Sequence, residues 1–137
     1  MPATIETQGN ALTYETIEPE AGLKAALAMS RADLVDVVRD SGLKGRGGAG
    51  FPTGMKWGFC AAEKAEQKYI VCNADEGEPG TFKDHVILTR FADLVFEGMT
   101  IGGFAIGASL GIVYLRAEYT YLRPHLNEVI QRRRAAG

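Results

Sequence analysis

The chain has 137 residues, 46% of them hydrophobic and 23% charged, which is the balance of one globular domain with a packed core. A second full domain would not fit. The net charge of -2, with acids and bases interspersed, argues against a nucleic-acid footprint, and the basic run at residues 132–134 suits the dipole at a helix end.

The cysteines and the apolar segments limit which cellular compartment and which kinds of site are expected. Cys60 and Cys72 form no CxxC pair and only two histidines accompany them, which argues against a metal site and fits thiols in a reducing compartment. No charged stretch followed by an apolar block opens the chain, so we expect no signal peptide and a cytoplasmic protein. Asp93 and Glu97 interrupt the apolar segment 91–114, so we expect no membrane insertion.

The first 29 residues are weakly patterned. They are predicted to form an amino-terminal extension, residues 1–29, with a short strand at 11–14 and a short helix at 23–29. Ser30 then suits a helix N-cap, with Asp33 three residues on.

The helix that follows Ser30 has one apolar face, formed by Leu34, Val37 and Val38, and Gly42 ends it. The loop 43–54 holds five glycines and one proline, so it is neither helix nor strand. The later elements are expected to be a helix at 56–65, a strand at 69–72, an irregular acidic segment at 73–84, a long helix at 86–109 closed by Gly111, a strand at 112–115 and a helix at 120–135.

This order of strand, long helix and strand predicts a crossover unit, whose two strands run parallel. The fold class is therefore α/β, and the domain is predicted to span residues 30–137. In such sheets ligands collect beyond the carboxyl ends of the strands, which is where the acidic segment 73–84 emerges.

The glycine loop, residues 45–50, satisfies the letters of G-x-G-x-x-G. The dinucleotide fingerprint also requires a strand before the loop and a helix at its end, and both conditions fail here. What remains is a bare main chain that can lie against a planar or phosphorylated ligand, with Lys56 adding a positive charge nearby. A plain glycine-rich surface loop is the equal alternative.

The acidic segment also allows several readings. Asp75, Glu76 and Glu78 could form a solvated turn, hold a hard cation, or accept hydrogen bonds from ribose or ribityl hydroxyls and ring N–H groups. The cation is disfavoured because the EF-hand pattern is absent. The aromatic side chains that flank the glycine loop could stack on rings or simply join the core; they are Phe51, Trp57 and Phe59.

Two long motifs carry a family resemblance. Residues 45–57 read GRGGAGFPTGMKW and residues 73–84 read NADEGEPGTFKD. With YLRAEY at 114–119, they closely resemble the FMN-binding domain of the family of NADH dehydrogenase flavoprotein subunits, from about Ser30 to Gly137. That family includes the flavoprotein of respiratory complex I and the diaphorase subunits of NAD-reducing hydrogenases and NAD-dependent formate dehydrogenases. The resemblance implies a Rossmann-like fold with parallel strands and crossover helices, and residues 30–137 are expected to form only part of it.

The resemblance also implies site residues. For FMN these would be Gly45, Gly47, Gly48, Lys56, Asn73, Asp75 and Glu76. For NADH they would be Glu78, Phe51 and Phe59. No side chain is expected to be catalytic, because the family's chemistry is hydride transfer from nicotinamide to the flavin. The family usually has arginine where this chain has His85 and glycine where it has Ala117, so His85 is expected to be structural.

The implied function is that of a diaphorase-type oxidoreductase component using FMN and NAD(H). Its electrons would pass to or from iron-sulfur clusters, which belong to the family's later regions or to partner subunits of a hydrogenase, a formate dehydrogenase or a quinone-linked module. Residues 1–137 alone are expected to be inactive. The alternatives are a truncated, non-catalytic assembly module of such a complex and an anion-binding domain without redox chemistry.

Overall fold

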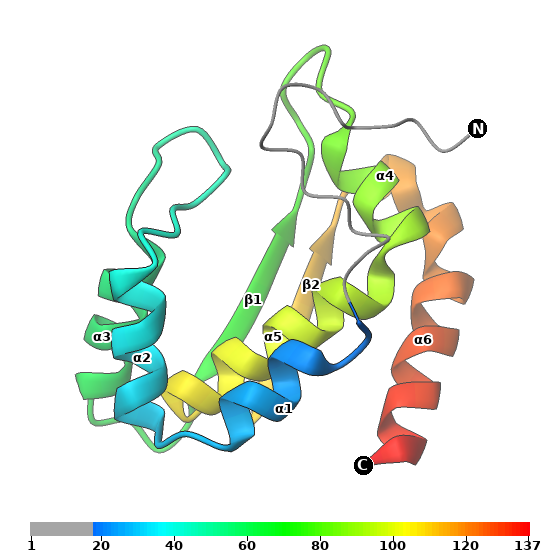
Figure 1. Ribbon diagram of the computed structural model, residues 1–137. Coiled ribbons are helices and arrows are strands. Elements are labelled where there is room, and N and C mark those ends of the chain that lie inside the picture. Colours follow the sequence, from blue (N-terminus) through cyan, green and yellow to red (C-terminus); the bar gives the residue numbers. More distant parts are fainter. Residues whose placement is uncertain (1–17) are drawn as a thin grey trace.

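A computed structural model describes residues 18–137 (Figure 1). In chain order the elements are α1 (Ala21–Leu27), α2 (Arg31–Asp40), α3 (Thr53–Ala62), β1 (Tyr69–Ala74), α4 (Lys83–Arg90), α5 (Ala92–Ile106), β2 (Leu110–Leu115), the 3-10 helix η2 (Ala117–Leu122) and α6 (Arg123–Ala136). No helix among these residues combines the length and apolarity needed to cross a bilayer. The strand predicted at 11–14 lies outside the described residues.

The two strands form a parallel pair, in register from Tyr69 opposite Leu110 to Ala74 opposite Leu115. Helices α4 and α5 connect them, so β1, the helices and β2 form a crossover unit. This confirms the predicted α/β class with parallel strands. Both strands point toward the end of the molecule from which the acidic segment leaves (Figure 1).

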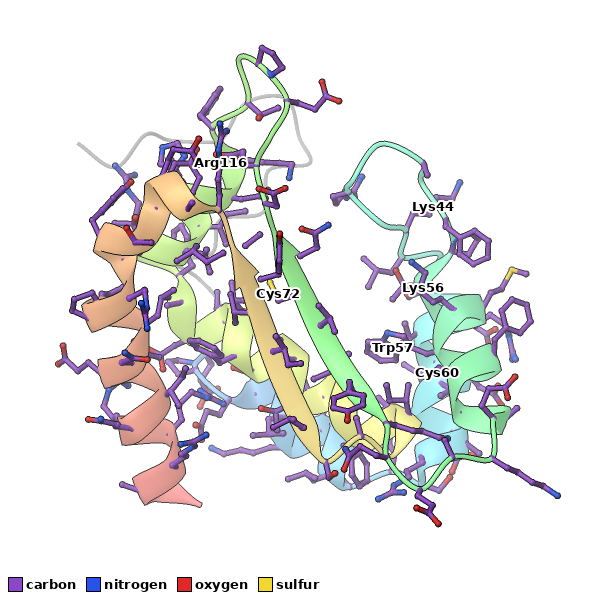
Figure 2. All side chains as sticks on the ribbon, turned by 180° about the vertical axis from the view of Figure 1, so that it is seen from behind. Lys44, Lys56, Trp57, Cys60, Cys72 and Arg116 are labelled. Carbon is purple, nitrogen blue, oxygen red and sulfur yellow. The ribbon has the colours of Figure 1, made fainter. Side chains whose placement is uncertain are left out.

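One face of the strand pair packs against α5 and the other has no helix over it among the described residues (Figure 2). On the covered face, the Ile70 side chain lies against Gly102 and Gly103 of α5. The large side chains of the uncovered face are all exposed; they are Tyr69, Val71, Leu110, Ile112 and Tyr114. The pair therefore has the apolar composition of a sheet meant to be buried on both faces, with only one of them buried here.

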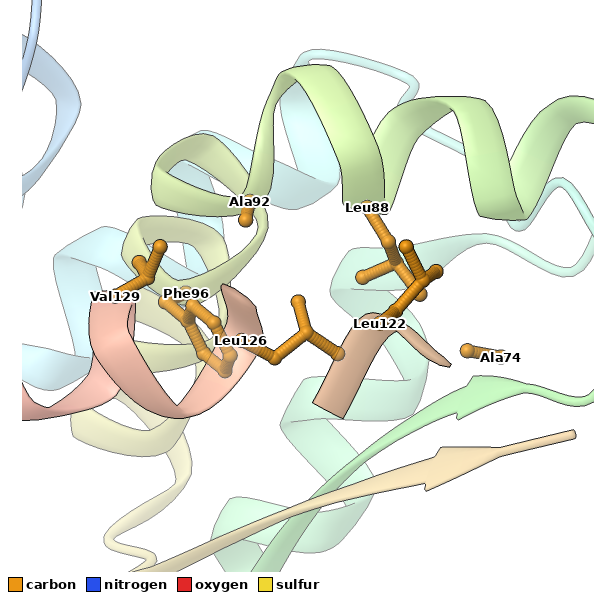
Figure 3. Close-up of a cluster of buried hydrophobic side chains, with 7 residues drawn as sticks. All are labelled: Ala74, Leu88, Ala92, Phe96, Leu122, Leu126 and Val129. Carbon is orange, nitrogen blue, oxygen red and sulfur yellow. The ribbon is translucent and has the colours of Figure 1, made fainter. Parts of the chain in front are cut away.

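The main core lies between α4, α5, η2 and α6 (Figure 3). Its buried members are Ala74, Leu88, Ala92, Phe96, Leu122, Leu126 and Val129. The predicted single helix at 86–109 is wrong, because the chain kinks at Phe91, whose φ of -132° and ψ of 32° are not helical. The kink places Leu88 and Ala92, from the two helices that meet there, in one cluster. No proline or glycine marks the kink, so periodicity alone extended the helix through it.

The helix predicted at 86–109 also ends earlier than expected, and the positions of two glycines explain the difference. Gly107, with φ of 75°, caps α5, whereas Gly111 lies inside β2 opposite Ile70. Left-handed backbone favours glycine at the first position, and close contact with the Ile70 and Met99 side chains occupies the space beside the second. Strand β2 accordingly begins at Leu110, two residues before the predicted start.

Helix α2 begins as predicted. The Ser30 hydroxyl accepts a hydrogen bond from the Asp33 N–H at 3.1 Å, which confirms the N-cap. Its apolar face is rotated from the predicted one, because Leu34 and Val35 are buried while Val37 is 50% exposed. The buried pair meets Ala26 of α1 and Ala105 of α5 in a second core cluster.

Helix α1 lies before the predicted domain start, yet it packs against α5. The buried Glu97 carboxylate of α5 accepts the N–H groups of Glu20 and Leu23, each at 3.0 Å, and so caps α1 from a distant part of the chain. The domain boundary between residues 29 and 30 stays a prediction.

Replacing Glu97 by glutamine should lower the free energy of unfolding by about 1–2 kcal/mol, because an amide cannot accept both buried N–H groups. Urea denaturation followed by circular dichroism measures the change. The exposed Glu66→Gln variant is the control and should unfold like the wild type. Equal unfolding midpoints for the two variants would contradict the assigned capping role.

Candidate functional site

The glycine loop and the acidic turn lie at the same end of the molecule. Figures 1 and 2 show both extending beyond the carboxyl end of β1, one leading into α3 and the other leading into α4. In Figure 2, Lys44 and Lys56 lie on the glycine-loop side and Arg116 lies on the acidic side. The arrangement agrees with the rule that ligands of parallel sheets bind beyond the carboxyl ends of the strands.

The base of the glycine loop is a short hairpin. An isolated bridge joins Lys44 to Pro52, the Gly45 N–H donates to the Phe51 carbonyl at 2.9 Å, and the Thr53 N–H donates to the Leu43 carbonyl at 2.9 Å. These contacts hold the two arms together. Residues 46–50, of which three are glycines, are thereby presented as a tip.

The tip of the glycine loop offers main-chain donors. Gly48 and Gly50 have φ of 107° and 63°, which favour glycine, and nothing lies within 4 Å of where a Cβ would stand at either residue. The N–H groups of residues 47–50 have no hydrogen-bond partner within residues 18–137. Such a run of free N–H groups can bind an anion or the edge of a heterocycle.

The loop is rooted where α2 and α3 cross. A Cβ added at Gly54, in the first turn of α3, would stand 2.3 Å from Arg39 Cα and 2.4 Å from Arg39 N. The two helix backbones therefore touch at this glycine. The contact fixes the direction in which the loop leaves the helix pair.

Three aromatic residues flank the loop, and the structure separates them. Trp57 packs against Gly102 of α5 and belongs to the core, as one of the two alternatives from the sequence requires; the other was stacking on a ligand ring. Phe51 and Phe59 are 42% and 61% exposed. Lys56 Nζ lies 5.7 Å from the centre of the Phe51 ring, so the lysine and this ring form one exposed cation–π pair beside the loop.

The acidic turn is shaped by its own polar groups. Asn73 Oδ1 accepts the Asp75 N–H at 3.1 Å, and the Glu78 carbonyl accepts both the N–H and the hydroxyl of Thr81. The side chains of Asp75 and Glu78 are exposed. They are therefore free to meet a ligand, as two of the sequence readings require.

Glu76 lies in the same turn but its environment is different, because its side chain is only 1% exposed. Its Oε2 accepts the Asp84 N–H at 2.5 Å, and its Oε1 lies 2.7 Å from His85 Nδ1 and 2.9 Å from the Tyr119 hydroxyl. Its main-chain carbonyl accepts from Arg116. The residue thus connects the turn after β1 to the segment after β2.

The electrostatics follow from these contacts. Burial alone raises the pKa of Glu76, but the hydrogen bonds from His85, the Asp84 N–H and Tyr119 outweigh it and lower the pKa to about 2. The hydrogen bond that the Tyr119 hydroxyl donates to Glu76 also raises the pKa of Tyr119. Arg116 and Glu118 form a bidentate pair, with N–O distances of 2.9 and 3.0 Å, which lowers the pKa of Glu118.

Arg116 and Tyr119 belong to the site, although they are not among the residues predicted for it from the sequence. The parallel register of the strands could have indicated these two residues. Ala74 lies opposite Leu115, so the residues that follow the two strands come together. His85 Nδ1 bonds to Glu76, and its ring is tilted against that of Tyr119 with the two centroids 5.0 Å apart, contacts that agree with the expected structural role.

A large groove lies elsewhere on the molecule. It has a volume of about 1110 Å³ and is bounded by α1, α5, β2 and α6. None of the predicted site residues lines it. The chemistry of the loops, and not the size of this groove, therefore selects the candidate site.

Residues 38–137 match the protein family described as the Nuo51 FMN-binding domain. The chain belongs to this family. The predicted resemblance is thereby confirmed, and FMN is the cofactor that this family's name carries. The match includes the whole of the glycine loop and the acidic turn.

Curated relatives of the Nuo51 FMN-binding family extend the comparison. The alpha chain of the NAD-reducing hydrogenase HoxS of Cupriavidus necator is 46% identical over 135 residues, covering 98% of this chain and 22% of that protein. HndC, from the NADP-reducing hydrogenase of Solidesulfovibrio fructosivorans, is 50% identical over 90% of this chain and 25% of that protein. A component of the NADH-quinone oxidoreductase of Escherichia coli is 42% identical over 86% of this chain and 27% of that protein.

A solved structure shares the fold. The crystal structure of an NAD⁺-reducing [NiFe]-hydrogenase in the H₂-reduced state matches with a TM-score of 0.82 and 47% identity, covering 91% of this chain and 22% of that chain. The chain therefore spans about a quarter of the length of the relatives it matches.

Proposed function

We propose that this chain is the FMN-holding part of a diaphorase-type flavoprotein that transfers hydride between NAD(H) and FMN. Electrons would pass to or from iron-sulfur clusters in a later region or in partner subunits. The parent complex would be a hydrogenase, a formate dehydrogenase or an NADH:quinone oxidoreductase. The observation that carries the proposal is the placement of the bare glycine loop and the acidic turn at one end of the sheet, in a chain of the Nuo51 FMN-binding family.

The donor set fits a flavin mononucleotide. FMN combines an anionic phosphate with ribityl hydroxyls and a ring that both donates and accepts hydrogen bonds. The free N–H groups of the glycine loop and the exposed Lys56 can bind its acceptors and negative charge, while Asn73 and Asp75 can accept from its donors. We assign Gly47, Gly48, Lys56, Asn73 and Asp75 to this role. Gly45, whose N–H is taken by the Phe51 carbonyl, would lie against the flavin with its bare main chain and donate no hydrogen bond.

The nicotinamide nucleotide would lie on the outer side of the flavin. Phe51 and Phe59 have exposed rings that can stack on NADH, and the exposed Glu78 carboxylate can accept from its hydroxyl or amide groups. FMN supplies hydride chemistry when bound. The protein's part is to orient the two rings and set their electrostatic surroundings, so we assign no side chain as acid, base or nucleophile.

Titration of the purified chain with FMN tests the proposal. We expect flavin fluorescence to be quenched on binding, and Lys56→Gln to weaken FMN affinity about tenfold because one phosphate or ring contact is lost. The matched control is Lys64→Gln, which removes an exposed lysine just beyond α3 and should leave the affinity unchanged. Equal affinities for the two variants would remove Lys56 from the site, and absence of binding by the wild type would count against FMN.

A non-catalytic binding or assembly module of such a complex is the second candidate. Anaerobic addition of NADH to the FMN-loaded chain separates the two. Bleaching of the flavin absorbance supports hydride transfer. Retention of the yellow colour, with FMN still bound, supports a binding or assembly role for this part of the flavoprotein.

A further inference from the structure

We propose that Glu76 is a positioning residue, which holds the acidic turn in shape through the segment after β2 and does not itself touch the flavin. The inference rests on the proposed function, because the turn is taken to face FMN and NADH. It assigns Glu76 a role different from that of its neighbours Asp75 and Glu78.

Contacts within the protein use the whole Glu76 carboxylate. Its two oxygens take three donors, which are the Asp84 N–H, His85 Nδ1 and the Tyr119 hydroxyl. The side chain is 1% exposed, so no ligand atom can reach it without displacing one of these donors. By contrast, the side chains of Asp75 and Glu78 on either side of it are exposed.

The contacts of Glu76 join two segments that the parallel strands bring together. Tyr119 and Arg116 follow β2, and they contact the side chain and the main-chain carbonyl of Glu76 respectively. Arg116 is itself held by the bidentate pair with Glu118. Asp84, at the far end of the turn, donates its N–H to the same carboxylate.

The turn is thus clamped at its beginning and at its end. Glu76 connects to Asp84, so the residues between them form a closed loop whose ends are joined by one carboxylate. Glu78 lies inside that loop and Asp75 lies directly before it. Their exposed carboxylates are therefore placed by a residue that no ligand contacts. His85 completes the clamp with its proton on Nδ1, because a carboxylate accepts there.

Two variants of the full chain test this role. Glu76→Gln replaces an acceptor by a group that cannot take all three donors, and Tyr119→Phe removes one hydroxyl. We expect faster hydrogen exchange at the Asp84 amide in both, even without flavin, and FMN affinity about tenfold weaker in Glu76→Gln. The double variant should lose no more affinity than Glu76→Gln alone, since both changes act on one network. The exposed Glu63→Gln variant is the control.

The flavin spectrum separates positioning from contact. In Glu76→Gln saturated with FMN, the absorption maxima of the flavin should equal those of the wild type. Shifted maxima would overturn the proposal, because they would show Glu76 in contact with the ring. Unchanged exchange at Asp84 would also overturn it. If the wild type binds no FMN while the exchange still changes, the clamp stands and the proposed function fails.

Discussion

Replacing Gly54 by alanine should lower the free energy of unfolding by about 3 kcal/mol, at the upper end of the usual range for overpacking. The new Cβ would stand 2.3 Å from Arg39 Cα and 2.4 Å from Arg39 N. Both are main-chain atoms of α2, so no side-chain rotation relieves the clash, and α2 and α3 must separate. Because the glycine loop is rooted at this crossing, FMN affinity should fall as well.

Urea denaturation of Gly54→Ala and Gly58→Ala measures the effect. Gly58 lies in the same helix, and a Cβ there would meet only Val35 Cγ1 at 3.7 Å, an ordinary contact. Gly58→Ala should therefore be neutral or stabilise the protein by about 0.5–1 kcal/mol, through the helix propensity of alanine. Similar unfolding midpoints for the two variants would show that α2 and α3 are not in backbone contact.

Acid should remove up to about 3 kcal/mol of stability through Glu76 alone. Its folded-state pKa of about 2 lies below the ordinary value of 4.5, so the ionised form stabilises the fold. This contribution is complete above about pH 5 and is lost as the pH falls through 4.5 toward 2. The clamp of the acidic turn should weaken over the same range.

Unfolding free energies of wild type and Glu76→Gln, measured between pH 7 and pH 2.5, check this prediction. Glutamine does not titrate, so the variant should be less stable at pH 7 and should lose less stability on acidification. Glu63→Gln should keep the full wild-type dependence, because that side chain is exposed. Parallel curves for wild type and Glu76→Gln would show that the carboxylate does not carry the linkage.

Local signals in the sequence were sufficient for several parts of the fold. The Ser30 cap depends on a residue three positions away, and the apolar run at β1 suffices to mark a strand, although one of its faces is exposed and not buried as predicted. The crossover rule then gave the parallel pairing with β2, and the long motifs gave the family. Each of these depends on neighbours in the chain or on a general rule of topology.

The remaining features depend on contacts between distant residues. The kink at Phe91 serves the packing of Leu88 and Ala92 against α6, which no helical periodicity encodes. Glu76 is buried partly because it binds Tyr119, which lies 43 positions later in the chain. Neither the residue type of Glu76 nor its acidic neighbours in the sequence indicates this burial. A register between β1 and β2 is needed before such partners can be paired.

The pinned base of the glycine loop has an energetic consequence for association. Ordering one residue's backbone opposes binding by about 1–2 kcal/mol in lost conformational entropy. The hairpin contacts of Gly45 and Thr53 and the helix crossing at Gly54 immobilise the arms before any partner arrives. Residues 46–50 are the part of the loop that lies beyond these contacts. A weakly attractive molecule can therefore be captured by main chain alone, since most of the segment's freedom was already lost during folding.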